Sequence, residues 1–178
     1  MTDNELLEGF MRELKGGNRD ALDGIYRITA KGVYLLAYSI LRNAESARDV
    51  MQDTFLRVAA NIDKYEPQNN AKAWVLIIAR NIGYREYANA KRNAGSAALE
   101  QLADARDYAS QWTDNAALAA VLNTLTTEER EIVTLFAIDG YKHREIAEIV
   151  SRPAGTVRWL YNRAINRLRK QMEAHDEK

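Results

Sequence analysis

The chain has 178 residues, of which 47% are apolar, with 25 basic and 25 acidic side chains and no cysteine. This is the composition of a folded globular protein, and it excludes disulfides, thiol nucleophiles and cysteine-based metal sites. The first residues lack a basic segment followed by an apolar one, and no apolar run approaches the ~20 residues of a membrane span. We therefore expect a cytoplasmic protein without membrane insertion.

The first ninety residues have apolar side chains at three- and four-residue spacing, which predicts four consecutive helices. The first covers about residues 5–14 and ends at Gly16-Gly17, and Asn18 is the expected N-cap of the second. The third covers about residues 44–62. The fourth begins near Ala71, after a break that Pro67 and two asparagines favour. No run alternates with period two, so we expect no strand.

Residues 93–114 differ from the rest of the chain in composition. Between residues 93 and 120 there is one basic side chain against four acidic ones, and the helical periodicity is weak. We expect a flexible acidic linker here, with a short helix near residues 99–105 and with Trp112 packed against one of the domains. The predicted fold is thus all-α, with two small helical domains at residues 1–92 and 115–178.

A helix-turn-helix is predicted near the C-terminus. Thr126 and Glu129 form a capping-box pattern at the start of a helix that ends at Asp139-Gly140. A short helix at residues 142–150, a three-residue turn and a helix at about residues 154–172 follow. The last helix has an apolar stripe that we expect to face inward, made of Val157, Leu160, Tyr161, Ala164, Ile165 and Leu168.

The opposite face of this last helix is basic, because residues 152–170 hold six basic side chains and no acid. Arginine can read guanine and asparagine can read adenine in the major groove, while small Ala154 and Gly155 would let the backbone approach a phosphate. An ordinary solvated basic face is the alternative. The short turn, the single sign of charge and Trp159 on the outer face favour DNA binding.

Several segments resemble sigma factors of bacterial transcription. Residues 125–135 (LTTEEREIVTL), 145–150 (EIAEIV) and 155–158 (GTVR) resemble their C-terminal promoter-reading domain. Residues 47–57 (ARDVMQDTFLR) and 73–81 (AWVLIIARN) resemble their N-terminal domain. The order, the spacing and the total length resemble the extracytoplasmic-function group (group 4) of the sigma-70 family, which keeps only these two domains.

The chain departs from the family pattern at three positions. Thr126 stands where the family usually has proline, and Ser151 stands in the turn where glycine is frequent. Trp159 follows Arg158 where serine is frequent. The last departure leaves the exact promoter sequence open.

The resemblance implies a function, its partners and its site residues. The protein would bind core RNA polymerase through the β′ clamp helices and the β flap, direct initiation at promoter DNA, and be held by an anti-sigma factor. The positions matching the clamp-helix contact are Asp49, Gln52, Asp53 and Phe55. Those matching the single-stranded minus-ten contact are Tyr65, Gln68, Asn69, Asn70, Lys72, Arg80, Asn81, Arg85, Lys91 and Arg92. Those expected on the minus-thirty-five duplex are Arg152, Ala154, Gly155, Thr156, Arg158, Trp159, Asn162, Arg163, Asn166, Arg169 and Lys170.

No catalytic, cofactor or metal motif is found, so we expect no enzymatic activity. His143 and His175 lie far apart in sequence without an acidic partner at metal-binding spacing, and His143 is expected on the surface. Two other functions remain open at this stage. An operator-binding regulator would be a dimer, whereas a sigma factor would be a monomer. A helical adaptor without a DNA role would show no salt-dependent DNA affinity.

Overall fold

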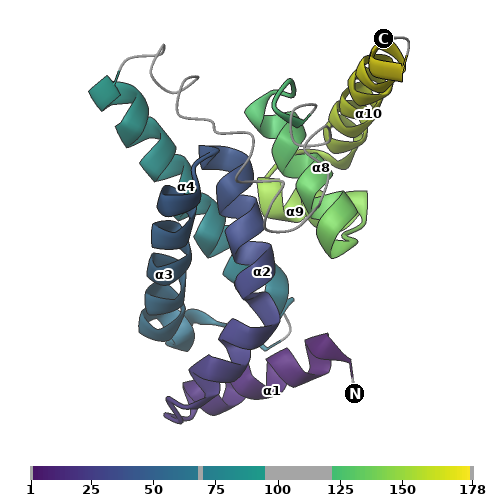
Figure 1. Cartoon of the computed structure of the whole chain (residues 1–178). Coiled ribbons are helices and arrows are strands. Elements are labelled where there is room, and N and C mark those ends of the chain that lie inside the picture. Colours follow the sequence, from purple (N-terminus) through teal and green to yellow (C-terminus); the bar gives the residue numbers. More distant parts are fainter. Residues whose placement is uncertain (1, 68–69, 95–121, 177–178) are drawn as a thin grey trace.

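The computed structural model describes residues 2–67, 70–94 and 122–176. Within these ranges the chain forms helices and no strand, which confirms the predicted all-α class (Figure 1). In chain order the elements are α1 (Asp3–Lys15), α2 (Ala21–Leu41), α3 (Ala44–Asn61), the 3-10 helix η1 (Ile62–Lys64), α4 (Ala71–Ala94), α8 (Thr127–Asp139), α9 (His143–Val150) and α10 (Ala154–Asp176). Residues 95–114 of the predicted linker, with its short helix and Trp112, lie outside the described residues.

The helix ends follow local chemistry. Thr126 Oγ1 accepts a hydrogen bond from the Glu129 backbone N–H at 3.2 Å, and the Glu129 carboxylate accepts one from the Thr126 N–H at 3.0 Å, so the predicted capping box is confirmed. Gly16 is the C-cap of α1, as predicted. The prediction for Asn18 is wrong, because Asp20 is the N-cap of α2 and the Asn18 side chain accepts from the Asp20 N–H in the preceding turn.

Helices α1–α4, which we call the N-terminal unit, pack around one apolar core. Leu7 of α1, Ile25 of α2, Val58 of α3 and Leu76 of α4 are all fully buried. Gly24 allows α1 and α2 to approach closely, because a Cβ atom there would lie 2.6 Å from the ring of Phe10. Helix α1 also begins with a capping box, in which Thr2 is the N-cap.

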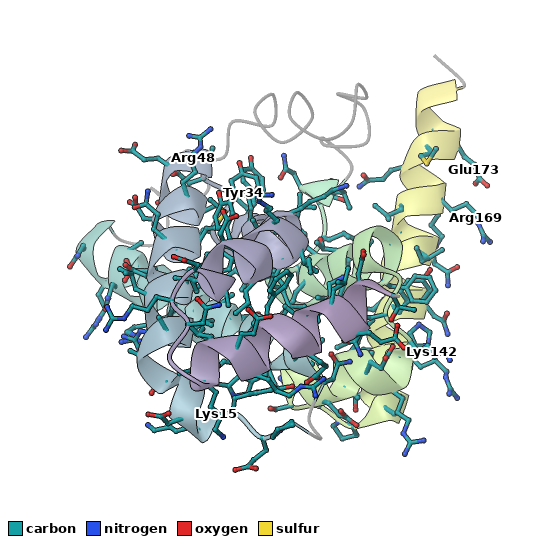
Figure 2. The ribbon with its side chains drawn as sticks, turned by 90° about the horizontal axis from the view of Figure 1, so that it is seen from below. Lys15, Tyr34, Arg48, Lys142, Arg169 and Glu173 are labelled. Carbon is teal, nitrogen blue, oxygen red and sulfur yellow. The ribbon has the colours of Figure 1, made fainter. Side chains whose placement is uncertain are left out.

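Helices α8–α10, which we call the C-terminal unit, contain the helix-turn-helix. Ile132 of α8 and Ile146 of α9 are fully buried within it. The inward stripe of α10 is confirmed, since Val157, Leu160, Ala164 and Leu168 are buried and Tyr161 and Ile165 are partly buried. Figure 2 shows the far end of α10, with Arg169 and Glu173, projecting beyond the other helices.

The two units pack directly against each other. Helix α8 contacts α2, and α9 contacts α4 (Figure 1). Buried apolar side chains from both units form one continuous cluster. Across the interface, Arg130 Nε donates to the Ser39 carbonyl at 2.6 Å and Arg42 Nε donates to Asn123 Oδ1 at 3.2 Å. The surfaces of α2 and α4 that face α8 and α9 are therefore covered in this structure.

Candidate functional site

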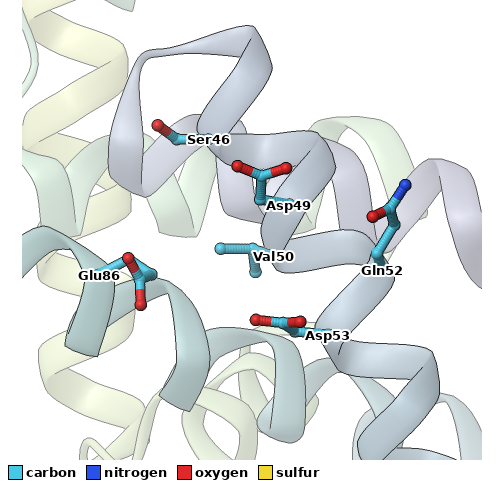
Figure 3. Close-up of a pocket in the computed structure, with 6 residues that line it drawn as sticks. All are labelled: Ser46, Asp49, Val50, Gln52, Asp53 and Glu86. Carbon is cyan, nitrogen blue, oxygen red and sulfur yellow. The ribbon is translucent and has the colours of Figure 1, made fainter.

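The outer face of α3 and the neighbouring part of α4 form an acidic hollow. Asp49, Gln52 and Asp53 are exposed, and with Ser46, Val50 and Glu86 they line a cavity of about 330 Å³ (Figure 3). This lining contains three carboxylates and no basic side chain. Such a surface attracts a positively charged partner and disfavours DNA.

Phe55 does not belong to this face. It is buried with 6% of its surface exposed, and its ring lies 4.9 Å from the ring of Tyr26. The side chain is part of the core in this structure, and its contact with the polymerase stays a prediction. Leu56 is exposed instead, at 68%, one helical turn after Gln52 and Asp53. Sequence reasoning missed Leu56, although its position on the helix, about 180° from Ala47, signals an apolar residue on the outer face.

Tyr65 and Asn70, which precede α4, are held by burial and by a capping hydrogen bond respectively. Tyr65 is fully buried, its hydroxyl donates to Glu8 Oε1 at 2.6 Å, and its ring lies 5.3 Å from that of Trp74. Burial, together with the Glu8 hydrogen bond, raises the pKa of the Tyr65 phenol. The Tyr65 ring is therefore enclosed by the protein in this structure, and its contact with the minus-ten strand stays a prediction. The Asn70 side chain caps α4 by accepting from the Ala73 N–H, while Gln68 and Asn69 lie outside the described residues.

A second cavity lies between α3 and α4, next to this segment. Its volume is about 220 Å³, and its lining combines an aromatic ring, apolar side chains, two amides and two cations: Arg57, Asn61, Lys64, Trp74, Ile78, Asn81 and Ile82. A flat apolar wall beside amide groups suits a nucleobase, which needs stacking and edge hydrogen bonds. Asn81, which the resemblance matches to the minus-ten contact, lines this cavity. Arg57 and Lys64 were missed, although both cations closely precede the predicted loop. Trp74 is half-buried and lines the cavity.

The predicted DNA-contacting cations of α4 fall into two groups. Arg85, Lys91 and Arg92 are exposed. Lys72 and Arg80 instead contact the C-terminal unit, since the Lys72 Nζ lies 5.3 Å from the centre of the Tyr141 ring and Arg80 pairs with a carboxylate of α8. In this conformation neither of these two cations presents an open surface to DNA.

That carboxylate belongs to Glu131, which is fully buried. Arg80 Nε donates to Glu131 Oε1 at 2.5 Å, and the Tyr84 hydroxyl donates to Oε2 at 2.7 Å. Burial raises the pKa of the Glu131 carboxyl, and the opposing charge of Arg80 with the hydrogen bonds of Arg80 and Tyr84 only partly offsets this effect. Burial and the neighbouring Glu131 charge also raise the pKa of Tyr84. This cluster is the polar centre of the contact between the two units.

The turn of the helix-turn-helix has a left-handed residue. Ser151 has φ 53° and ψ 46°, and its backbone N–H donates to the Ala147 carbonyl. The Arg152 N–H donates to the same carbonyl at 3.1 Å, and α10 begins directly after Pro153. The left-handed geometry explains why glycine suits this position, as the resemblance implied.

The outer face of α10 is exposed, as predicted. Its exposed side chains and backbone positions are Ala154, Gly155, Arg158, Trp159, Asn162, Asn166, Arg169 and Lys170, and Thr156 is half-buried. Trp159 is 57% exposed and carries the Arg163 guanidinium 4.5 Å from its ring centre. Arg152 pairs with Glu128 at 2.6 Å.

Arg163 is held within the protein. Its Nε donates to Glu129 Oε1, and Arg167 Nη1 donates to Glu129 Oε2 at 3.2 Å, so both tie α10 to α8. The predicted contact of Arg163 with DNA is not supported by this geometry, because its guanidinium is paired and stacked. Burial alone would raise the pKa of the Glu129 carboxyl, but the Thr126 N–H and the two guanidinium groups lower it.

The structure corrects the expectation that His143 lies on the surface. It is half-buried, with its ring 5.1 Å from that of Phe136 and 4.9 Å from that of Tyr161. It therefore packs α9 onto α8 and α10.

Among residues 2–67, 70–94 and 122–176 there is no group of side chains arranged to hold a metal ion. No helix in those ranges combines the length and the apolar character that crossing a bilayer requires.

Comparison with known proteins connects these surfaces to one family. Residues 25–93 match the family described as Sigma-70 region 2, and residues 115–168 match Sigma-70, region 4. The chain is 32% identical over 137 residues to the ECF RNA polymerase sigma factor EcfG of Rhodopseudomonas palustris, covering 74% of each chain. It is 28% identical over 179 residues to the ECF RNA polymerase sigma factor SigC of Mycobacterium tuberculosis, covering 98% of this chain and 96% of the relative.

Two solved structures have the same fold. CnrH, in complex with the cytosolic domain of CnrY, matches with a TM-score of 0.72 at 22% identity over 97% of this chain and 99% of that chain. The sigma factor RpoE of Bartonella quintana, in complex with the anti-sigma factor NepR, matches with a TM-score of 0.68 at 24% identity over 83% and 94%.

The chain belongs to the extracytoplasmic-function group of the sigma-70 family of sigma factors. It is accordingly a sigma factor that directs promoter-specific transcription initiation.

Proposed function

We propose that the N-terminal unit docks on core RNA polymerase and captures the minus-ten strand along one continuous face between α3 and α4. The observation that carries this proposal is the pair of cavities on that face. The one beside Asp49 and Asp53 has three carboxylates, and the one beside Asn81 has two cations. The opposite charges suit a basic protein surface and a nucleic-acid strand lying next to each other.

The cavity beside Asn81 is the proposed pocket for a flipped minus-ten base. Trp74 supplies an aromatic wall, and the amides of Asn61 and Asn81 supply hydrogen-bond donors and acceptors. Arg57 and Lys64 at the same cavity would neutralise the adjoining phosphates, and the exposed Arg85, Lys91 and Arg92 would continue the phosphate path along α4. Base choice would thus reside in the pocket, and affinity in the cations.

The C-terminal unit is proposed to read the minus-thirty-five duplex with α10 while contacting the β flap. Arg158 and Asn162 lie on its exposed face near the start of the helix, whereas Arg169 and Lys170 lie about three turns further along. The first pair would meet base edges and the second pair phosphates. Arg163 and Arg167 would act on DNA only indirectly, by fixing the angle of α10 through Glu129.

This function requires the two units to separate. The centres of the minus-ten and minus-thirty-five elements are roughly 25 base pairs apart, which is about 85 Å along a duplex at ~3.4 Å per base pair. The units here share one apolar cluster, so they cannot contact both elements at once. Contact with core polymerase would supply the free energy that opens the interface.

Further partners and properties follow from the family. Of the two solved structures of the same fold, RpoE is in complex with the anti-sigma factor NepR and CnrH is in complex with the cytosolic domain of CnrY. We propose that this chain is likewise held by an anti-sigma factor. It would act in the cytoplasm, where polymerase and DNA are located, without cofactor or catalytic activity.

The test is a comparison of promoter binding with and without core polymerase. We expect a monomeric protein that co-purifies with core and that binds a promoter fragment in a salt-dependent manner only as part of the holoenzyme. A dimer that binds a palindromic site equally well without core would instead identify an operator-binding regulator.

A further inference from the structure

Helix α1 holds both ends of the segment that leads into α4. This helix precedes residues 25–93, the part of the chain that matches Sigma-70 region 2. Glu8 Oε1 accepts a hydrogen bond from the Tyr65 hydroxyl at 2.6 Å and another from the Ala71 backbone N–H at 3.3 Å. Lys15 Nζ donates to the Tyr65 carbonyl at 2.7 Å. One carboxylate oxygen thus joins the residue before the segment to the residue after it.

The same contacts reach the proposed base pocket. The Tyr65 ring that Glu8 orients lies 5.3 Å from the Trp74 ring, at an interplanar angle of 61°. Trp74 is in turn a wall of the cavity that contains Asn81. A displacement of Tyr65 would therefore move the aromatic wall, while Asn81, on the next turns of α4, would stay in place.

We propose that Glu8 is a positioning residue for minus-ten recognition, which sets the place of Tyr65 and Ala71 and, through Tyr65, of the Trp74 wall, and so determines how strictly the pocket selects its base. This inference rests on the proposed function of that pocket. Hydrogen bonds to a charged acceptor are the stronger kind, which suits a carboxylate in this role.

Four variants distinguish an effect of Glu8 on the position of Tyr65 and Trp74 from an effect on the stability of α1. Glu8→Ala removes both hydrogen bonds, Tyr65→Phe removes one, and Glu8→Gln keeps an oxygen that can accept from both donors. Gly9→Ala can compensate for a loss of stability in α1, because a Cβ atom at position 9 meets nothing within 4 Å and alanine favours helix more than glycine does. The double variant Glu8→Ala/Gly9→Ala should regain thermal stability in α1 without regaining the contacts.

The readout is discrimination, measured as the ratio of initiation on a preferred promoter to initiation on promoters with one minus-ten base exchanged. Each variant is assembled with core polymerase. We expect Glu8→Ala to lower this ratio roughly three- to tenfold, the effect of one or two lost hydrogen bonds. The Glu8→Ala/Gly9→Ala double variant should show the same lowered ratio as Glu8→Ala. Because Tyr65 and Glu8 share a hydrogen bond, the effects of Tyr65→Phe and Glu8→Ala on the ratio should not add. Glu8→Gln should keep most of the wild-type ratio.

Full discrimination by the Glu8→Ala/Gly9→Ala double variant would overturn the inference, since Glu8 would then act only on stability. Equal loss on preferred and exchanged promoters would overturn it as well, because the ratio would not change. A wild-type holoenzyme that fails to initiate at any promoter would instead contradict the proposed function.

Discussion

The contact between the two units can be weakened at one residue without disturbing either core. Glu131 lies on α8, and its hydrogen-bond partners Arg80 and Tyr84 both lie on α4. Glu131→Ala removes both hydrogen bonds and leaves Arg80 and Tyr84 without this acceptor. At about 1 kcal/mol lost per bond, the closed arrangement loses about 2 kcal/mol, which shifts the equilibrium between closed and open forms by roughly 30-fold.

Because the chain has no cysteine, the opening can be followed with dyes at two introduced thiols. Ala60 on α3 and Ala174 on α10 are exposed positions for Ala60→Cys and Ala174→Cys. We expect Glu131→Ala to lower energy transfer between the dyes. Glu129→Ala is the matched control, because the partners of Glu129 are Thr126, Arg163 and Arg167, all outside the N-terminal unit. It should lower the melting temperature while leaving the transfer unchanged.

The same interface should respond to pH. Burial raises the pKa of Glu131 in the closed form, so the closed form binds this proton more tightly than an open form with an exposed carboxyl. Closure is therefore favoured at low pH and weakens as pH rises through the raised pKa. The groups facing this carboxyl are Arg80, Tyr84 and Glu128. Glu131→Ala should remove this part of the pH dependence, and unchanged transfer and pH response in that variant would refute the reasoning.

Three further predictions concern single positions. Phe55→Ala should lower the unfolding free energy by ~3–5 kcal/mol in thermal melts, because it empties a core position. Leu56→Ala should leave stability nearly unchanged and weaken co-purification with core polymerase. The reverse result would place the docking face elsewhere. Ser151→Gly should raise stability by up to ~1 kcal/mol, because glycine adopts φ 53° without strain, and a lower melting temperature would contradict this. The last prediction concerns binding of the holoenzyme to promoters with altered minus-thirty-five elements. Arg158→Ala should cost ~1–3 kcal/mol of binding free energy at one or two base pairs, while Lys170→Ala should weaken binding to all duplexes alike and lower the slope of affinity against salt by about one. Exchanged effects would mean that α10 docks in the opposite direction.

The features that the sequence predicts well depend on neighbouring residues. Thr126 and Glu129 are three positions apart, and their capping box forms as expected. The inward stripe of α10 follows from helical periodicity, and its residues are buried or partly buried as expected. Local hydrogen bonding and amphipathicity decide both, so no knowledge of the rest of the chain is needed.

The features that sequence reasoning missed depend on contacts between distant residues. Tyr65 and Glu8 are 57 positions apart, and Arg80 and Glu131 are 51 apart. A motif places a residue in the family pattern, but only packing decides whether it is exposed. Tyr65 and Phe55 both occupy matching positions and are both buried. The α4 cations likewise fall into two groups because one side of α4 meets the C-terminal unit, where Lys72 lies against Tyr141 and Arg80 pairs with Glu131.

The most direct test of the central claim is run-off transcription with purified core RNA polymerase on a library of promoter fragments. We predict that core alone gives no specific transcript, and that adding the protein selects templates with a defined minus-ten and a defined minus-thirty-five element at one spacing. Asn81→Ala should relax the minus-ten choice alone, and Arg158→Ala the minus-thirty-five choice alone. The account would be contradicted if the protein bound core and promoter DNA yet produced no template-specific transcript, or if selection depended on a single element.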